Sequence, residues 1–419
     1  MSRTLVRTGT AAIAAVLLPL TAVPAAYAQP DPQPDPGPAA VAPDPTALTR
    51  EATAIAERAA SERQSLRARS ATPTAADLDR AVDAFIADGA VGVTARVETP
   101  GLEWSGAGGV REVGKKKAVR PGDRFHVASN TKTLISTLVM QEVERGGWTL
   151  DTPANDLLPG TFPDGVTIKH LLNHTSGAPR GPEEILFDRV EDPSSWDQLI
   201  DALGQYYSEA EHLAFMRGAG WLFEPGTDFS YSNYGYVALG VMLEKETGER
   251  IEDLVRDRVL EPAGMRQSAY PTDARNRGPF LEDAGHYEGR WRPMTDLHPS
   301  IFHAAGAATS TTEDLAELNE SLLTGKLVSP ASVEKMLPPI AGSTDPDYGF
   351  GIYRVADPCN PGEYLYGHDG AHMGAQSISW GSPDGTRQIT LGWTGRNWDS
   401  TDPIYDLSLL LEPMLLATC

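Results

Sequence analysis

Strand-like alternation occurs at both ends of this 419-residue chain, whereas the long middle region, 150–300, has the patterns of helix and loop. The strand patterns lie at 91–98 and 102–112 near the N-terminus, and at 348–355, 364–370 and 377–394 near the C-terminus. This order predicts an α+β fold rather than alternating βαβ units. We expect one sheet assembled from N- and C-terminal pieces, with a mainly helical insertion.

The first 28 residues have the three parts of a secretory signal peptide. Arg3 and Arg7 form a positive start, an apolar run follows, and Ala26-Tyr27-Ala28 is an A-x-A cleavage site. The apolar run contains two prolines and is short for a membrane span. We therefore predict cleavage near Ala28, a secreted protein, and no stable membrane anchor.

The region between the signal peptide and the ordered domain, 29–74, is expected to be a linker. It begins as a Pro/Asp-rich segment and continues as an Ala-, Arg- and Glu-rich stretch, which could be a solvated helix or a pro-segment. Helical spacing at 76–87 predicts that the ordered domain spans 75–419. Its α/β part would comprise 75–150 and 300–419, and its helical part 150–300.

Charge and cysteine usage limit the partners and cofactors. The net charge is −22 and there is no long basic tract, which disfavours nucleic acid and anionic membranes. Cys359 and Cys419 are an even pair in an exported chain, which predicts one disulfide, although two free thiols are the alternative. Neither cysteine lies in a C-x-x-C motif, so redox catalysis and a zinc site are not expected.

Ser129 and Lys132 lie three residues apart in F-H-V-A-S-N-T-K-T-L-I-S (125–136), where a short strand meets an amphipathic helix. Ser129 could be a helix cap, or a nucleophile whose proton is taken by the amine one turn along the helix. The same spacing occurs at Ser332 and Lys335, in a polar helix start that we expect at the surface.

Two further motifs carry groups suited to acyl transfer. Tyr231 and Asn233 would project together, as a proton relay and an amide donor, although an ordinary loop capping a helix at Asn233 or Ser232 is the alternative. In His368-Asp369-Gly370, the glycine would let a substrate lie along the strand edge. The backbone N–H of Ala371 would join that of Ser129 in an oxyanion hole.

A metal site formed by His368, Asp369 and His372 is a competing interpretation of the third motif. It is disfavoured because histidines four apart on a strand are too distant to share one ion. We expect no metal and no cofactor.

The order S-x-x-K, Y-x-N, H-x-G resembles the serine β-lactamase and penicillin-binding-protein family, specifically its class C and secreted D-alanyl-D-alanine carboxypeptidase branch. Further segments that look like this branch lie at 166–177, 223–236, 304–315 and 348–352. The resemblance covers roughly 75–418. It implies a β-lactamase/transpeptidase-like fold, in which an antiparallel sheet is flanked by helices.

The resemblance also implies roles for the motif residues. Ser129 matches the acylated nucleophile, Lys132 and Tyr231 a coupled base and acid, and Asn233 the donor to the substrate carbonyl. His368 and Gly370 match the third motif.

The third motif also departs from the carboxypeptidase pattern. Asp369 and Ala371 stand where such enzymes often have threonine, and Arg354 is the nearby candidate cation for a substrate carboxylate. An acidic Asp369 beside the site would disfavour a free carboxylate unless a cation neutralises it.

The expected function is a secreted serine hydrolase acting through an acyl-enzyme on D-amino-acid peptides, most simply a D-alanyl-D-alanine carboxypeptidase. Its partners would be a small peptide or peptidoglycan-derived substrate, with β-lactams as possible acylating ligands. A D-aminopeptidase, an esterase or a β-lactamase of the same family, and a non-catalytic penicillin-binding sensor, are the alternatives.

Overall fold

The computed structural model describes residues 46–65, 72–340, 345 and 347–419. The expected signal peptide and most of the Pro/Asp-rich segment lie outside the described residues. Within them, no helix has both the length and the apolar character needed to cross a membrane.

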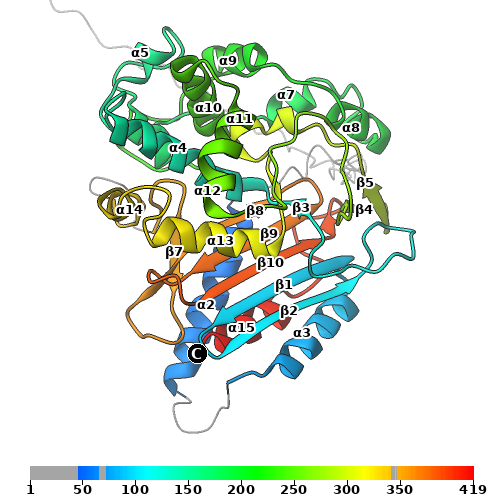
Figure 1. Cartoon of the computed structure of the whole chain (residues 1–419). Helices are drawn as coiled ribbons and strands as arrows, with labels where there is room; N and C mark the ends of the chain where they lie inside the picture. Colours follow the sequence, from blue (N-terminus) through cyan, green and yellow to red (C-terminus); the bar gives the residue numbers. More distant parts are fainter. Residues whose placement is uncertain (1–45, 66–71, 341–344, 346) are drawn as a thin grey trace, which may run out of the picture. The chain divides into compact units, whose positions relative to one another are not determined.

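A six-stranded antiparallel sheet with the order β2-β1-β10-β9-β8-β7 forms the framework (Figure 1). Its strands are β1 (Gly92–Thr99), β2 (Leu102–Gly109), β7 (Tyr353–Ala356), β8 (Tyr364–Ala371), β9 (Ala375–Gly381) and β10 (Gln388–Thr394). The N-terminal hairpin joins the C-terminal strands where β1 pairs with β10. The predicted assembly of one sheet from both ends of the chain is therefore confirmed.

One face of the sheet is covered by three helices: α2 (Ala47–Ser65), α3 (Ala75–Asp88) and α15 (Ser408–Ala417). Helix α2 precedes residue 75 and contributes to the core of this face. Its buried residues are Leu48, Ala52, Ile55, Ala56 and Ala59. Their burial against the sheet and α15 shows that α2 packs as part of this core.

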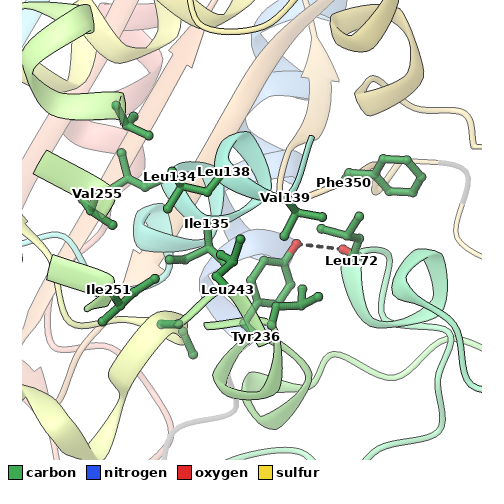
Figure 2. Close-up of a cluster of buried hydrophobic side chains, with 14 of the residues drawn as sticks. Leu134, Ile135, Leu138, Val139, Leu172, Tyr236, Leu243, Ile251, Val255 and Phe350 are labelled. Atoms are coloured by element: carbon green, nitrogen blue, oxygen red, sulfur yellow. Dashed lines mark hydrogen bonds between the residues drawn. The ribbon is translucent and has the colours of Figure 1, made fainter. Parts of the chain in front are cut away.

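The other face carries α13 (Thr312–Leu323) and, beyond it, the helical part of the chain. Helix α4 (Thr131–Arg145) is central there. The sequence predicts an amphipathic helix, but its residues from Thr131 to Met140 are all buried. Figure 2 shows the reason: leucine, isoleucine and valine side chains of α4 pack against Tyr236 and Leu243 of α10 (Asn233–Thr247). Helix α4 ends at Arg145, and Gly146 is its C-cap with a φ of +79°, as the glycine pair in the sequence predicts.

The remaining elements are short. The further helices are α5 (Ala154–Leu157), α6 (Ile168–Leu172), α7 (Glu183–Phe187), α8 (Trp196–Leu203), α9 (Glu209–Gly218), α11 (Ile251–Val255), α12 (Glu261–Ala263) and α14 (Pro330–Met336), with turns η1 (Ala128–Asn130), η2 (Arg256–Leu260), η3 (Pro299–Ile301) and η4 (His303–Ala305). Two small sheets are formed by β3 (Phe125–His126) with β6 (Thr309–Ser310), and by β4 (Asp283–Tyr287), β5 (Arg290–Met294) and β11 (Arg396–Asn397). The sequence patterns of the middle region do not reveal β4 and β5.

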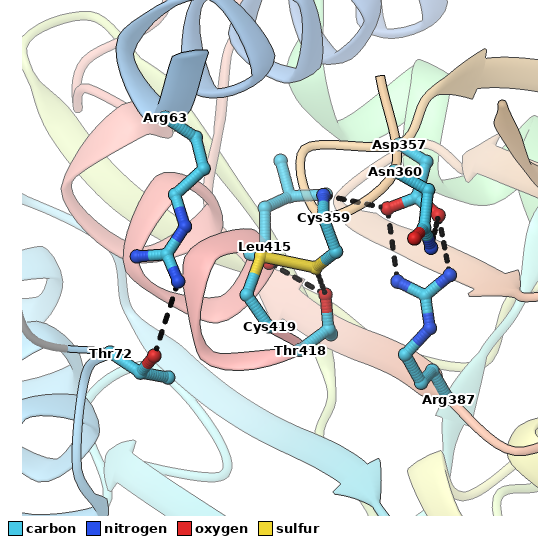
Figure 3. The surroundings of a disulfide bond; sticks show 9 residues. All are labelled: Arg63, Thr72, Asp357, Cys359, Asn360, Arg387, Leu415, Thr418 and Cys419. Carbon is cyan, nitrogen blue, oxygen red and sulfur yellow. Dashed lines mark hydrogen bonds and ion pairs between the residues drawn. A yellow bond between two sulfur atoms is a disulfide. The ribbon is translucent and has the colours of Figure 1, made fainter. Parts of the chain in front are cut away.

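A disulfide joins Cys359 to Cys419, as the cysteine count predicts (Figure 3). It ties the end of α15 to the connection between β7 and β8. The Cα atoms are 5.0 Å apart, within the usual range for a disulfide. The C-terminus is thereby fixed to the sheet edge.

Candidate active site

Ser129 lies in η1, between β3 and α4. The helix-cap interpretation of Ser129 is wrong in detail, because α4 begins at Thr131 and Asn130 occupies its N-cap position. The Ser129 hydroxyl is instead 2.9 Å from Nζ of Lys132. Ala128, directly before it, has a φ of +47°, a conformation that is costly for a residue with a Cβ.

Lys132 is fully buried, and oxygen atoms of Ser129, Asn233 and Ala305 lie near its Nζ. It lies 2.9 Å from Oγ of Ser129, 2.7 Å from Oδ1 of Asn233 and 2.8 Å from the carbonyl oxygen of Ala305. A charged ammonium can donate to all three. A neutral amine can donate to Asn233 and Ala305 and point its lone pair at the Ser129 hydroxyl. The arrangement thus accommodates both states that a proton shuttle needs.

Tyr231, in the loop before α10, and Asn233, the first residue of α10, reach the same lysine. The Tyr231 ring centroid is 4.8 Å from Nζ of Lys132, and the ring is buried. Ser232 caps α10, since its Oγ accepts from the backbone N–H of Gly235 at 3.1 Å. Ser232 therefore caps the helix, while Tyr231 and Asn233 lie beside Lys132. The two interpretations of this motif, a helix cap and a shared site, are both compatible with the structure.

His174 supports this loop and was given no role by sequence reasoning. Its Nδ1 accepts a hydrogen bond from the backbone N–H of Ser232 at 3.1 Å, and its ring centroid is 4.2 Å from that of Tyr231. Burial lowers the pKa of His174 well below its usual value, and the positive charge of Lys132 lowers it further. A neutral imidazole thus packs against the face of Tyr231.

The third motif lies on β8, whose side chains alternate between the two faces of the sheet. Nε2 of His368 lies 3.0 Å from the Tyr348 hydroxyl. The sequence argument that Gly370 keeps the strand edge open for substrate is incomplete. A Cβ at Gly370 would lie 2.2 Å from the Val127 carbonyl oxygen and 2.9 Å from the Ser129 nitrogen. Glycine is required because two backbones meet there.

Asp369 lies next to His368 of the same motif, and its Oδ1 is 3.5 Å from Nδ1 of His368. Asp369 pairs with Ile378, a core residue of the face that α2 covers, and its carboxylate accepts from the Thr49 hydroxyl on α2. Its carboxylate is therefore placed between Thr49 of α2 and the imidazole of His368. The backbone of Ala371 continues β8 beyond Gly370.

Arg354 lies on β7 and is engaged by neighbouring side chains. Its Nε donates to Asp347 at 2.9 Å, and its guanidinium lies 4.0 Å from the Tyr364 ring centroid. Arg354 also lines a cavity of about 410 Å³ whose wall includes Tyr231 and Arg50 of α2. Arg354, the cation expected to bind a substrate carboxylate, thus lies near the site but is already paired with Asp347.

The serine–lysine copy on α14 is not assembled into a site. Ser332 is buried, contrary to the expected surface position, and its backbone N–H is held by Ser329. Lys335 is exposed.

The metal group considered for the third motif is not brought together either, because Asp369 is bound by Thr49 and Nδ1 of His372 lies 2.7 Å from Asp283. Within the described part of the chain, two other groups have potential ligand atoms within 4.8 Å of one another: His126, Asp283 and His372, and Glu209, Glu244 and His303. In the second group, burial and the facing Glu209 raise the pKa of Glu244 to about 8. A protonated Glu244 relieves the repulsion between the two carboxyl groups at neutral pH.

The fold and this constellation define the class: a serine hydrolase with a β-lactamase/transpeptidase-like fold. The family model described as Beta-lactamase matches residues 78–407, so the chain belongs to this family.

Penicillin-binding proteins are among the sequence relatives. The chain is 30% identical to penicillin-binding protein 4 of Amycolatopsis lactamdurans over 292 residues, covering 64% of this chain and 71% of the relative. It is 28% identical to penicillin-binding protein 4* of Bacillus subtilis over 264 residues, covering 58% of this chain. The match spans only 55% of that Bacillus protein.

Solved structures extend the comparison. A D-stereospecific amidohydrolase from Streptomyces sp. superposes with a TM-score of 0.68 at 27% identity, covering 77% of this chain and 95% of the other. D-amino acid amidase from Ochrobactrum anthropi SV3, at 22% identity and a TM-score of 0.67, covers 81% of this chain and 97% of its own. The second likeness supports the shared fold.

Proposed function

We propose that this protein is a secreted serine hydrolase that cleaves amide bonds in D-amino-acid peptides through an acyl-enzyme on Ser129, with D-alanyl-D-alanine carboxypeptidase as its first expected activity. The single observation that carries the proposal is the buried amine of Lys132, held by Asn233 and Ala305 with Ser129 Oγ 2.9 Å away. A serine placed beside a buried amine is suited to nucleophilic catalysis.

In the proposed reaction, neutral Lys132 takes the Ser129 proton while Oγ attacks the substrate carbonyl carbon. The backbone N–H groups of Ser129 and Ala371 stabilise the resulting oxyanion. Tyr231, coupled to Lys132, returns the proton to the leaving nitrogen as the C–N bond breaks. Water then attacks the ester, and Ser129 recovers its proton. Oδ1 of Asn233 is held by Lys132, which turns the donor end of its amide toward a substrate carbonyl.

A second candidate is hydrolysis of D-aminoacyl amides or of peptides without a free terminal carboxylate. Two findings favour it. Arg354, the candidate cation for a substrate carboxylate, is already engaged by Asp347 and Tyr364. The similarity to a D-stereospecific amidohydrolase across 95% of that chain points in the same direction.

The proposal is tested by incubating the mature protein with a fluorescent penicillin and locating any adduct by mass spectrometry. We expect an adduct on Ser129 that is lost in Ser129→Ala and kept in the matched control Ser332→Ala. An adduct that persists in Ser129→Ala would refute the site. If no adduct forms, and D-Ala-D-Ala peptides and short esters stay intact, a non-catalytic binding module that uses the same pocket would be favoured.

The two candidate activities are separated by substrate pairs. Turnover of a D-Ala-D-Ala peptide acid is compared with that of its amide, and each with the corresponding L-peptide. Preference for the acid supports the carboxypeptidase, whereas equal or better turnover of the amide supports the amidohydrolase. Equal turnover of D- and L-substrates would contradict both.

A further inference from the structure

Asp283 is a buried carboxylate at the start of β4 that joins two separate parts of the chain. Its Oδ1 lies 2.7 Å from Nδ1 of His126, and its Oδ2 lies 2.7 Å from Nδ1 of His372. Oδ2 also accepts from the backbone N–H groups of Gly374 and Ala375, at 2.8 and 2.9 Å. Four donors therefore converge on a carboxyl group that has no exposed surface.

The two histidines flank the residues that supply the proposed oxyanion donors. His126 lies on β3, three residues before Ser129, and His372 directly follows Ala371 on β8. Their rings stack with centroids 4.5 Å apart. Asp283 therefore binds to both segments at positions adjacent to the backbone contact between Gly370 and Val127.

The charge state fits this arrangement. Burial alone would raise the pKa of Asp283, but the two imidazoles beside it and the hydrogen bonds they donate hold that pKa well below its usual range. An ionised carboxylate only accepts, so both Nδ1 atoms carry protons. The Nδ1–oxygen distances of 2.7 Å are those of charge-assisted hydrogen bonds. Asp283 thus acts as an anionic link rather than as a proton donor.

We propose that Asp283 is a positioning residue for the hydrolase reaction: its two oxygens, acting through His126 and His372, set the separation of the Ser129 and Ala371 N–H groups that receive the oxyanion. This inference rests on the proposed function. Oxyanion donors act mainly on the transition state, and a small displacement of a reacting group can cost about 100-fold in rate. Loss of the link should therefore lower kcat while leaving KM nearly unchanged.

The primary test is Asp283→Asn. An asparagine keeps one acceptor oxygen, but its NH₂ group faces N–H donors and cannot accept from them. One of the two segments therefore loses its hydrogen bond to residue 283. We expect kcat to fall about 10- to 100-fold, with KM changed less than about 3-fold. The affinity of a boronic acid, which forms a tetrahedral adduct with a serine nucleophile, should fall by a similar factor to kcat.

Asp357→Asn is the matched control. Asp357 is also a buried carboxylate with several donors, namely Arg387, Asn360 and the backbone N–H of Cys359, but these lie beside the disulfide (Figure 3). Its substitution should lower the urea midpoint without lowering kcat. If Asp283→Asn loses only stability, as the control does, or raises KM rather than lowering kcat, the positioning role is refuted.

Two substitutions of His372 provide a second test in case Asp283→Asn does not fold. His372→Asn keeps a donor near the place of Nδ1, whereas His372→Ala removes it. We expect the asparagine variant to retain most of kcat and the alanine variant to lose it, and equal activities of the two variants would overturn the inference. Absence of a Ser129 adduct in the unmodified protein would instead refute the proposed function, so the two failures are distinguishable.

Discussion

The hydroxyl of Thr49 on α2 donates to the carboxylate of Asp369 on β8, 3.1 and 3.0 Å from its two oxygens. The two residues are 320 positions apart. Helix α2 lies before the first residue matched by the family model, residue 78. A helix outside the matched region therefore binds the strand that carries the third motif.

Replacing Thr49 with valine should destabilise the protein by about 1–3 kcal/mol, because it removes a donor from a nearly fully buried carboxylate. Urea unfolding followed by circular dichroism measures the change. Thr53→Val is the matched control on the same helix and beside the same cavity. Equal midpoints for the two variants would show that the hydrogen bond to Asp369 has no net effect.

Gly370→Ala should abolish acylation of Ser129 and lower the melting temperature. The new Cβ would lie 2.2 Å from the carbonyl oxygen of Val127, and neither backbone can move without displacing Ser129. Gly101→Ala, in the open turn between β1 and β2, is the control and should change neither property. Normal acylation of Gly370→Ala would mean that the two segments separate at little cost.

Asn233→Asp should slow acylation at pH 7 by at least about 10-fold, because a carboxylate 2.7 Å from Nζ stabilises the charged form of Lys132. Stopped-flow acylation by a fluorescent penicillin gives the rate. Asn319→Asp, a buried site on α13, is the control. An unchanged acylation rate in Asn233→Asp would argue against a neutral lysine as the base.

His212 on α9 should make the protein less stable as the pH falls. Burial lowers the pKa of His212 to about 4, although its ring also contacts the Ser300 carbonyl. Between about pH 6.5 and pH 4, His212 is protonated in the unfolded chain but neutral in the folded chain. The contribution of His212 to stability is therefore complete above pH 6.5 and is lost as the pH falls toward 4. The loss from this residue between pH 7.5 and 5 is about 2 kcal/mol.

His212→Gln removes the titration while keeping a hydrogen-bond donor. Urea unfolding at pH 7.5 and pH 5 should show a smaller difference for this variant than for the unmodified protein. The same pH dependence in both proteins would assign the effect to other groups.

The double substitution Cys359→Ser/Cys419→Ser should lower the free energy of unfolding by about 4 kcal/mol, from the entropy of the 60-residue loop that the bond closes. Acylation should be unchanged, because Cys359 lies before the first residue of β8, whereas His368 to Ala371 lie at the other end of that strand. The same protein treated with a reductant should match the variant. A loss of acylation without loss of stability would contradict this separation.

Much of the fold could be predicted from residue patterns. The alternation at both ends of the chain predicts the composite sheet, and the spacing before Gly146 predicts α4 closely. Strands β4 and β5 were missed because D-A-G-H-Y and R-W-R-P-M carry no clear alternation. Their pairing depends on partners rather than on local periodicity. Ala305, His174 and Tyr348 lie in segments that resemble the family, yet the pattern alone gives them no role.

The sequence by itself determined the composite sheet and the order of the three motifs, and the even cysteine count predicted one disulfide, because these follow from local periodicity, spacing and residue counts. Only the tertiary structure decided that Asp369 turns toward Thr49, that Gly370 lies against Val127, and that Asp283 links His126 to His372. Each of these contacts joins segments far apart in the chain. Their geometry is set by how whole helices and strands pack, which no local pattern encodes.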